Sequence, residues 1–176
     1  MPESLTDDSL PPYSYVPRGP WPHPFSSPQG HSHGQRVAVV PPFVDDAWEE
    51  SPMFLRAVRL FNAGYYWEAH EAWESLWHAH GRHGAEADLL KALIKLAAAG
   101  VKVREGQPHG IGTHAYRART LFQKIREGSR ERIFGLDLKR LEDFAETIAA
   151  NTAIEHGPPD APAHRVFAFQ IEPTKD

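Results

Sequence analysis

The chain has 176 residues, of which 41% are hydrophobic and 24% charged, as in an ordinary globular protein of one domain. Its formal net charge of -4 gives it no general attraction to nucleic acids or anionic membranes. It has no cysteine, which excludes disulfides, thiolate metal sites and thiol nucleophiles. The start MPESLTDDSL has no apolar signal region, and no apolar run reaches the roughly 20 residues that span a bilayer. We therefore expect a cytoplasmic protein.

The first 45 residues differ in composition from the rest of the chain. LPPYSYVPRGPWPHPFSSPQGHSHG is rich in Pro, Gly and Ser, which do not sustain a helix or a central strand. Disordered tails are poor in aromatic residues, but this segment contains Tyr13, Tyr15, Trp21 and Phe25. We therefore expect residues 1–45 to form an extended arm packed on the body of the protein. Its histidines, which we expect to be exposed loop residues rather than metal ligands, are His23, His31 and His33.

Five helical segments are predicted after the arm. Ser51 followed by Pro52 is typical of an N-cap and first helical position, and MFLRAVRLF supplies an apolar stripe. Glycine-containing turns separate the later segments. The predicted helices are 51–62, 65–80, 85–105, 112–127 and 136–156.

This pattern predicts an all-α fold, a single compact bundle of about five helices with an extended N-terminal arm. The helical domain would cover residues 46–156. A C-terminal tail, 157–176, contains HRVFAFQIEP, whose weak alternation indicates a short extended segment.

The second predicted helix carries most of the chemistry. Ala69, Trp73 and Leu76 share its core face, while His70 and Glu74 form a ladder that starts beside that face. Trp67 lies on the opposite, polar side. An indole there indicates that another helix, the arm or a second subunit covers this side too.

A covered helix cannot leave Glu71 and Glu74 unpaired, because isolated buried carboxylates are costly. The third predicted helix places Lys95 on a polar stripe, and its small residues at 97–100 allow close approach of the Trp-rich helix. The fourth helix directs His114 inward. We therefore expect one binding cluster, formed by His70, Glu71, Glu74, Lys95 and His114.

Three uses of this cluster remain open. A hydrogen-bonded ionic network could fix the helix register, in which case Glu74→Ala should lower stability by about 3 kcal/mol. Alternatively, His70, Glu74 and His114 could hold a divalent transition metal with Glu71 as the catalytic base, because HEAWE is similar to a zinc-protease helix with Glu in place of the second His. The cluster could instead bind a small anionic molecule through Lys95 and His114.

The stretch FNAGYYWEAHEAWESLW, Phe61 to Trp77, resembles the signature of the family called domain of unknown function 309. The following ALIKLAAA, residues 92–99, is similar to the family's next helix, and the resemblance covers about residues 51–127. Lys95 stands where the family often has Gln, which favours an ion pair with the carboxylates over a bare metal site. The resemblance implies a compact, all-helical domain that self-associates, and it implies no reaction.

Two functions are therefore predicted. The first is a structural or partner- or ligand-binding helical module that forms a homo-oligomer and engages neither nucleic acid nor membrane. The alternative is a metal-dependent hydrolase with His70 and Glu74 as ligands and Glu71 as base. The sequence leaves the substrate and the identity of any metal undetermined.

Overall fold

The computed structural model describes residues 9–37 and 39–175. The start of the acidic stretch MPESLTDDSL, from which we expected no signal peptide, lies outside these residues. The main helices are α1 (Pro52–Asn62), α2 (Tyr66–Ala79), α3 (Ala85–Arg104), α4 (Pro108–Glu127) and α5 (Leu138–Ala150). A 3-10 helix, η1 (Asp45–Glu50), precedes α1. The predicted all-α bundle is confirmed.

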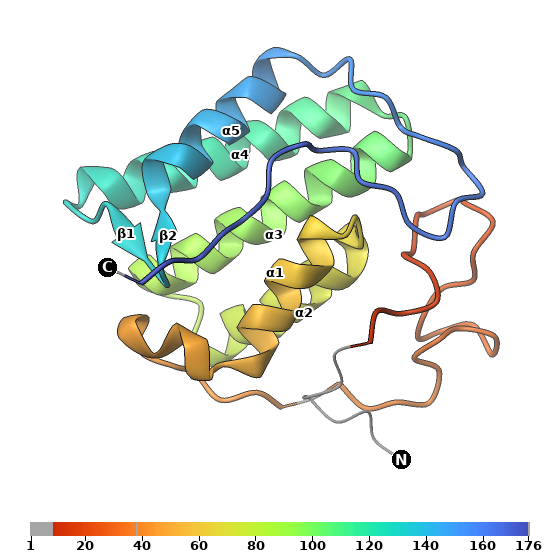
Figure 1. Cartoon of the computed structure of the whole chain (residues 1–176), viewed down its shortest axis with the longest axis horizontal. Coiled ribbons are helices and arrows are strands. Elements are labelled where there is room, and N and C mark those ends of the chain that lie inside the picture. Colours follow the sequence, from red (N-terminus) through yellow and green to blue (C-terminus); the bar gives the residue numbers. More distant parts are fainter. Residues whose placement is uncertain (1–8, 38, 176) are drawn as a thin grey trace.

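Each helix packs against its neighbours in sequence, in the order α1, α2, α3, α4, α5 (Figure 1). Helix α3 is the centre of the bundle, since 12 of its 20 residues are buried. Its Gly100 lies under the ring of Tyr66 on α2, where an added Cβ would be 2.5 Å from the ring. The predicted close approach of the small residues of α3 to the Trp-rich helix is thereby confirmed.

Three predicted helix boundaries are wrong. Helix α4 begins at Pro108 rather than at residue 112, because proline suits the first helical position. The residues taken as the start of α5 instead form strand β2 (Leu136–Asp137), which pairs antiparallel with β1 (Arg132–Ile133). Helix α5 then starts at Leu138 with Asp137 as N-cap, whose carboxylate accepts a hydrogen bond from the Arg140 backbone N–H at 3.0 Å. It ends at Ala150, and residues 151–156 are extended.

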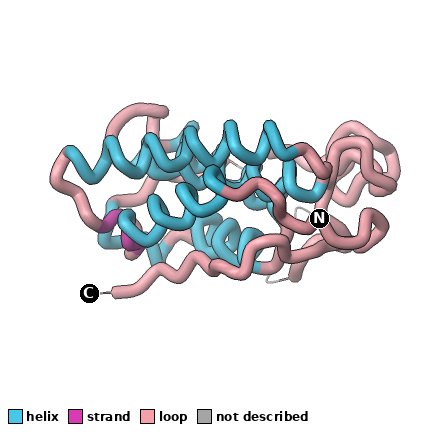
Figure 2. Tube along the Cα trace, turned by 90° about the horizontal axis from the view of Figure 1, so that it is seen from above, coloured by secondary structure: helices cyan, strands magenta, loops and turns pink. Residues whose placement is uncertain are grey.

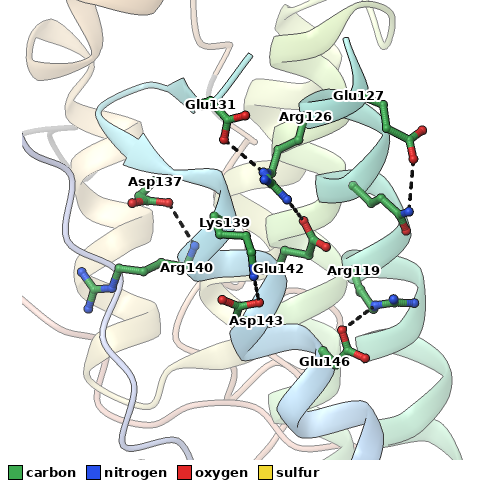
Figure 3. A network of polar contacts seen from close by, with 11 residues as sticks. Arg119, Arg126, Glu127, Glu131, Asp137, Lys139, Arg140, Glu142, Asp143 and Glu146 are labelled. Atoms are coloured by element: carbon green, nitrogen blue, oxygen red, sulfur yellow. Dashed lines mark hydrogen bonds and ion pairs between the residues drawn. The ribbon is translucent and has the colours of Figure 1, made fainter. Parts of the chain in front are cut away.

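Ion pairs on the outer side of the bundle join α4 to α5 (Figure 3). Arg126 contacts Glu142 at 2.7 Å, and Arg119 contacts Glu146 at 3.0 Å. These pairs are partly exposed to solvent, which screens them, so each contributes little to stability. The buried apolar residues of the helices hold them together, and the ion pairs add little.

The C-terminal segment crosses the bundle without forming a helix or strand (Figure 1). The side chain of Asn62 receives a hydrogen bond from the Ile171 N–H and donates one to the Ile171 carbonyl, both at 2.8 Å. Gly64, with φ of 88°, leaves room for the backbone of His164, which an added Cβ would approach to 2.7 Å. The Asn and Gly of the turn between α1 and α2 therefore hold this segment in place.

The N-terminal arm gathers beside one end of the bundle, as Figure 2 shows from above. Its centre is Tyr13, which is 5% exposed and stacks on Trp21 at a centroid distance of 5.2 Å. The Tyr13 hydroxyl donates to the Pro22 carbonyl at 2.9 Å. Rings of the arm also surround Trp67 of α2, namely Tyr15, His23 and Phe25.

Candidate functional site

Three glutamates on α2 occupy two different environments. Glu68 is 7% exposed, whereas the side chain of Glu71, one turn further along, is 35% exposed. Glu74 is also half-buried. The sequence predicted a site at Glu71 and Glu74 and missed Glu68.

His70, Glu71 and Glu74 form the metal-type group of α2. Each offers one ligand atom, and these three atoms lie within 4.8 Å of one another. The Nδ1 of His70 is 3.3 Å from Oε1 of Glu71, which satisfies the distance of an ion pair. The same Nδ1 is nevertheless buried without a hydrogen bond, because the two groups are not aligned for one. The helix therefore brings the His70 imidazole and the Glu71 carboxylate close together, and no hydrogen bond joins them.

Lys95 of α3 lies near this metal-type group. Burial lowers the pKa of its ammonium, and the positive charges of Arg117 and Lys91 lower it further, while the carboxylate of Glu74 acts in the opposite direction. Within the described residues Lys95 forms no ion pair. The ion pair that we expected from this lysine is therefore replaced by an interaction at longer range.

His114 of α4 points toward the same region but does not join the group of three. Burial lowers its pKa to about 4, helped by the charges of Lys95, Arg117, Lys102 and His70, so the ring is neutral at pH 7. Its Nδ1 is buried and has no hydrogen-bond partner among the residues that the structure describes. Of the predicted metal ligands, the structure brings together His70 and Glu74, and Glu71 takes the place expected for His114.

Glu68 is the centre of a separate, saturated cluster. Its carboxylate accepts hydrogen bonds from the Ser14 hydroxyl at 2.7 Å and the Tyr15 N–H at 2.9 Å. The Nε2 of His31 is 3.4 Å from the same carboxylate, and the His31 side chain is only 10% exposed. The expectation that His31 is an exposed loop residue is wrong, because its ring is enclosed between Tyr13 and Glu68. His23 is likewise half-buried against Trp67, whereas His33 is exposed.

The sequence contained a signal for this second cluster. Trp67 on the polar side of the helix already predicted a cover there, and Glu68 is its neighbour. A carboxylate beneath the same cover needs hydrogen-bond donors, and the arm supplies them. What the sequence lacked was the pairing of Ser14 and His31 with one particular glutamate more than thirty residues away.

Comparison with protein families gives one match. The family described as Domain of unknown function (DUF309) matches residues 54–113, a span that includes the metal-type group and Lys95 and stops one residue before His114. The comparison with curated proteins gives no match. In the part of the chain that the structure describes, no helix is both long and apolar enough to cross a membrane. The match to the family of domain of unknown function 309 thus covers most of α1, all of α2 and α3 and the start of α4.

Proposed function

We propose that this helical domain binds one divalent metal ion between His70, Glu71 and Glu74. The observation that carries this proposal is the convergence of three ligand atoms within 4.8 Å on one side of α2. Two ligand atoms bonded at about 2.1 Å to one tetrahedral ion lie about 3.4 Å apart. Side-chain rotations that bring the three atoms closer together would therefore close the site. One imidazole with two carboxylates suits zinc, manganese or iron.

The lack of hydrogen bonds to these ligand atoms supports a bound cation rather than a purely structural network. The Glu74 carboxylate accepts no hydrogen bond from residues 9–37 or 39–175. His70 Nδ1 likewise has no hydrogen bond. Polar groups that serve only the fold are normally paired when they are buried. These two groups are instead available to a ligand.

A structural role belongs to Glu68 instead. Its carboxylate fixes the arm on α2 through Ser14, Tyr15 and His31. This arrangement supports the structural part of the function predicted from the sequence, but with a different glutamate in that role.

A metal held by three protein ligands keeps coordination positions open, as catalytic metal sites do. The hydrolase predicted from the sequence is the activity that such a site supports, since a bound metal lowers the pKa of its water. Glu71 was predicted as the base of that reaction. Its place beside His70 makes it a ligand in this proposal, so another group would act as the base.

The experiment uses untagged protein that has been treated with a chelator to remove metal. Isothermal titration calorimetry measures the binding of Zn²⁺ and of Mn²⁺, and elemental analysis of the dialysed complex gives the number of bound ions. We expect one equivalent of metal and at least about tenfold weaker binding by Glu74→Gln, which keeps the side-chain volume and removes the charge. The control is Glu155→Gln, a change at an exposed carboxylate outside the group, which should bind as the wild type does. Absence of saturable binding of either ion by the wild type would refute the proposal.

A further inference from the structure

An open hollow of roughly 580 Å³ lies along α4, within the size range of small-molecule sites. Its polar lining residues are His109, Thr113, Tyr116, Arg117 and Thr152. Neither the metal proposal nor the family match gives this hollow a role.

Arg117 belongs both to the hollow and to the electrostatic surroundings of Lys95 and His114. It lines the hollow, and its positive charge also lowers the pKa of both Lys95 and His114. The guanidinium of Arg117 is therefore close enough to these two groups to act on their charges.

Two cations in this region have no anionic partner. Within the described residues neither Lys95 nor Arg117 forms an ion pair, whereas Lys102 pairs with Glu105 at 2.7 Å. Elsewhere on α4 the arginines that face α5, Arg119 and Arg126, each contact a carboxylate (Figure 3). The charge of Arg117 lowers the pKa of Lys95, so the two cations repel, and an anion placed between them removes that repulsion.

The charge balance indicates which anion fits. A divalent ion would neutralise Glu71 and Glu74, so the charges of Lys95 and Arg117 would remain. These two positive charges match a phosphate dianion better than a single carboxylate. Arginine also binds phosphate with two parallel hydrogen bonds, and the Thr113 and Tyr116 hydroxyls of the hollow can donate to phosphate or ligand oxygens.

We propose that the hollow binds a small phosphate-bearing molecule whose phosphate lies between Arg117 and Lys95 and reaches the metal held by His70, Glu71 and Glu74. This inference rests on the proposed metal site for the last of these contacts only. The contacts with Arg117 and Lys95 do not require the metal.

The test uses inorganic phosphate as the probe. The full chain is first titrated with Mn²⁺, which measures the metal site by itself. Phosphate is then added to three samples of the protein. The first contains Mn²⁺ at a concentration below that of the protein, the second contains Mg²⁺, and the third contains no metal. Because Mn²⁺ is paramagnetic, we expect saturable broadening of the ³¹P resonance only where the bound phosphate lies beside the ion. Acetate added as competitor should displace phosphate weakly.

Two variants and one control locate the phosphate. Arg117→Gln and Lys95→Gln should each weaken phosphate binding about tenfold, the loss of one charge-assisted contact, and leave the Mn²⁺ affinity within about threefold. Arg119→Gln removes the same charge from α4, but from an arginine paired with Glu146, and should change phosphate binding less than about twofold.

The outcomes separate the two proposals. Normal Mn²⁺ binding without saturable phosphate binding overturns the phosphate site and keeps the metal. Phosphate binding that depends on Arg117 and Lys95 in a protein that binds no Mn²⁺ overturns the metal and keeps the phosphate site. An equal loss in Arg119→Gln shows that only general surface charge attracts phosphate, which overturns the site. If acetate competes for the hollow as effectively as phosphate binds to it, the hollow is a site for carboxylates instead.

Discussion

Glu68 and Glu74 lie on the same helix less than two turns apart, yet the protein treats them in opposite ways. The carboxylate of Glu68 is enclosed by the arm and accepts two hydrogen bonds beside the ring of His31. The carboxylate of Glu74 is half-buried, accepts no hydrogen bond within the described residues and lies beside His70 and Glu71. The first arrangement uses a charge to hold the chain together, whereas the second leaves a charge free for a ligand.

The difference shows that burial of a carboxylate does not by itself identify a functional site. Glu68 is the more buried of the two but has its hydrogen bonds satisfied, so nothing remains for a ligand to contribute. At Glu74 the combination of partial burial, unsaturated oxygens and a nearby imidazole is what indicates binding.

The largest expected effect comes from removing the Glu68 carboxylate. Glu68→Ala leaves the Ser14 hydroxyl, the Tyr15 N–H and the His31 ring without their acceptor, and we expect a loss of about 3 kcal/mol in the free energy of unfolding. The matched change Glu74→Ala should cost less than about 0.5 kcal/mol. Urea unfolding followed by tryptophan fluorescence gives both values, and proteolysis should cut the arm faster in Glu68→Ala alone. Equal losses in the two variants would remove the distinction between the two glutamates.

A substitution on α3 beneath α2 should affect both the Glu68 cluster and the metal-type group. In Gly100→Ala the new methyl group meets the ring of Tyr66, a residue that is 2% exposed. The Tyr66 hydroxyl accepts hydrogen bonds from the N–H groups of Val166 and Phe167. Overpacking of this kind costs about 2 kcal/mol, and the displaced ring should shift α2.

We therefore expect lower stability in urea and changes in both Trp67 fluorescence and metal affinity. Ala98→Ser, a small change at a half-buried position of the same helix, serves as the control. An unchanged urea unfolding curve for Gly100→Ala would show that Tyr66 has room to move.

The smallest expected effect concerns pH. His114 has a pKa of about 4 in the folded protein, below its ordinary value of 6.5, chiefly because of burial. Between these values the unfolded chain binds the proton more readily, so stability falls as the pH decreases from 6.5 to 4. Because the ring is only half-buried, we expect a contribution of about 1 kcal/mol after allowing for solvent screening.

The measurement is urea unfolding of wild type and His114→Gln at pH 7 and pH 5. Other titrating groups act in both proteins and cancel in the comparison, so the wild type should lose more stability between the two pH values. A pH dependence identical in the two proteins would contradict the buried, neutral state of His114.

The helices were largely predictable because their signals are local. Ser51 and Pro52 marked the start of α1, and the glycines after α2 and α4 marked their ends. The hairpin before α5 was not predictable, because two-residue strands have no detectable alternation and Asp137 serves both as strand end and as helix cap. The helical period alone placed His70, Glu71 and Glu74 on one side of α2. His114 was assigned as a metal ligand from its inward direction, which says nothing about distance.

The sequence by itself determined the helical period, the caps, the core face of α2 and the presence of acidic and imidazole groups on a single side of that helix. These features depend on residues within a few positions of one another. Only the tertiary structure decided which glutamate has its hydrogen bonds satisfied and which has none. The hydrogen-bond donors to Glu68 are Ser14 and Tyr15, which lie in the arm more than fifty residues earlier in the chain. The tertiary structure likewise decided that Arg117 lines the hollow and acts on the charges of Lys95 and His114. Contacts between such distant segments depend on how loops cross the bundle, and no local pattern records that.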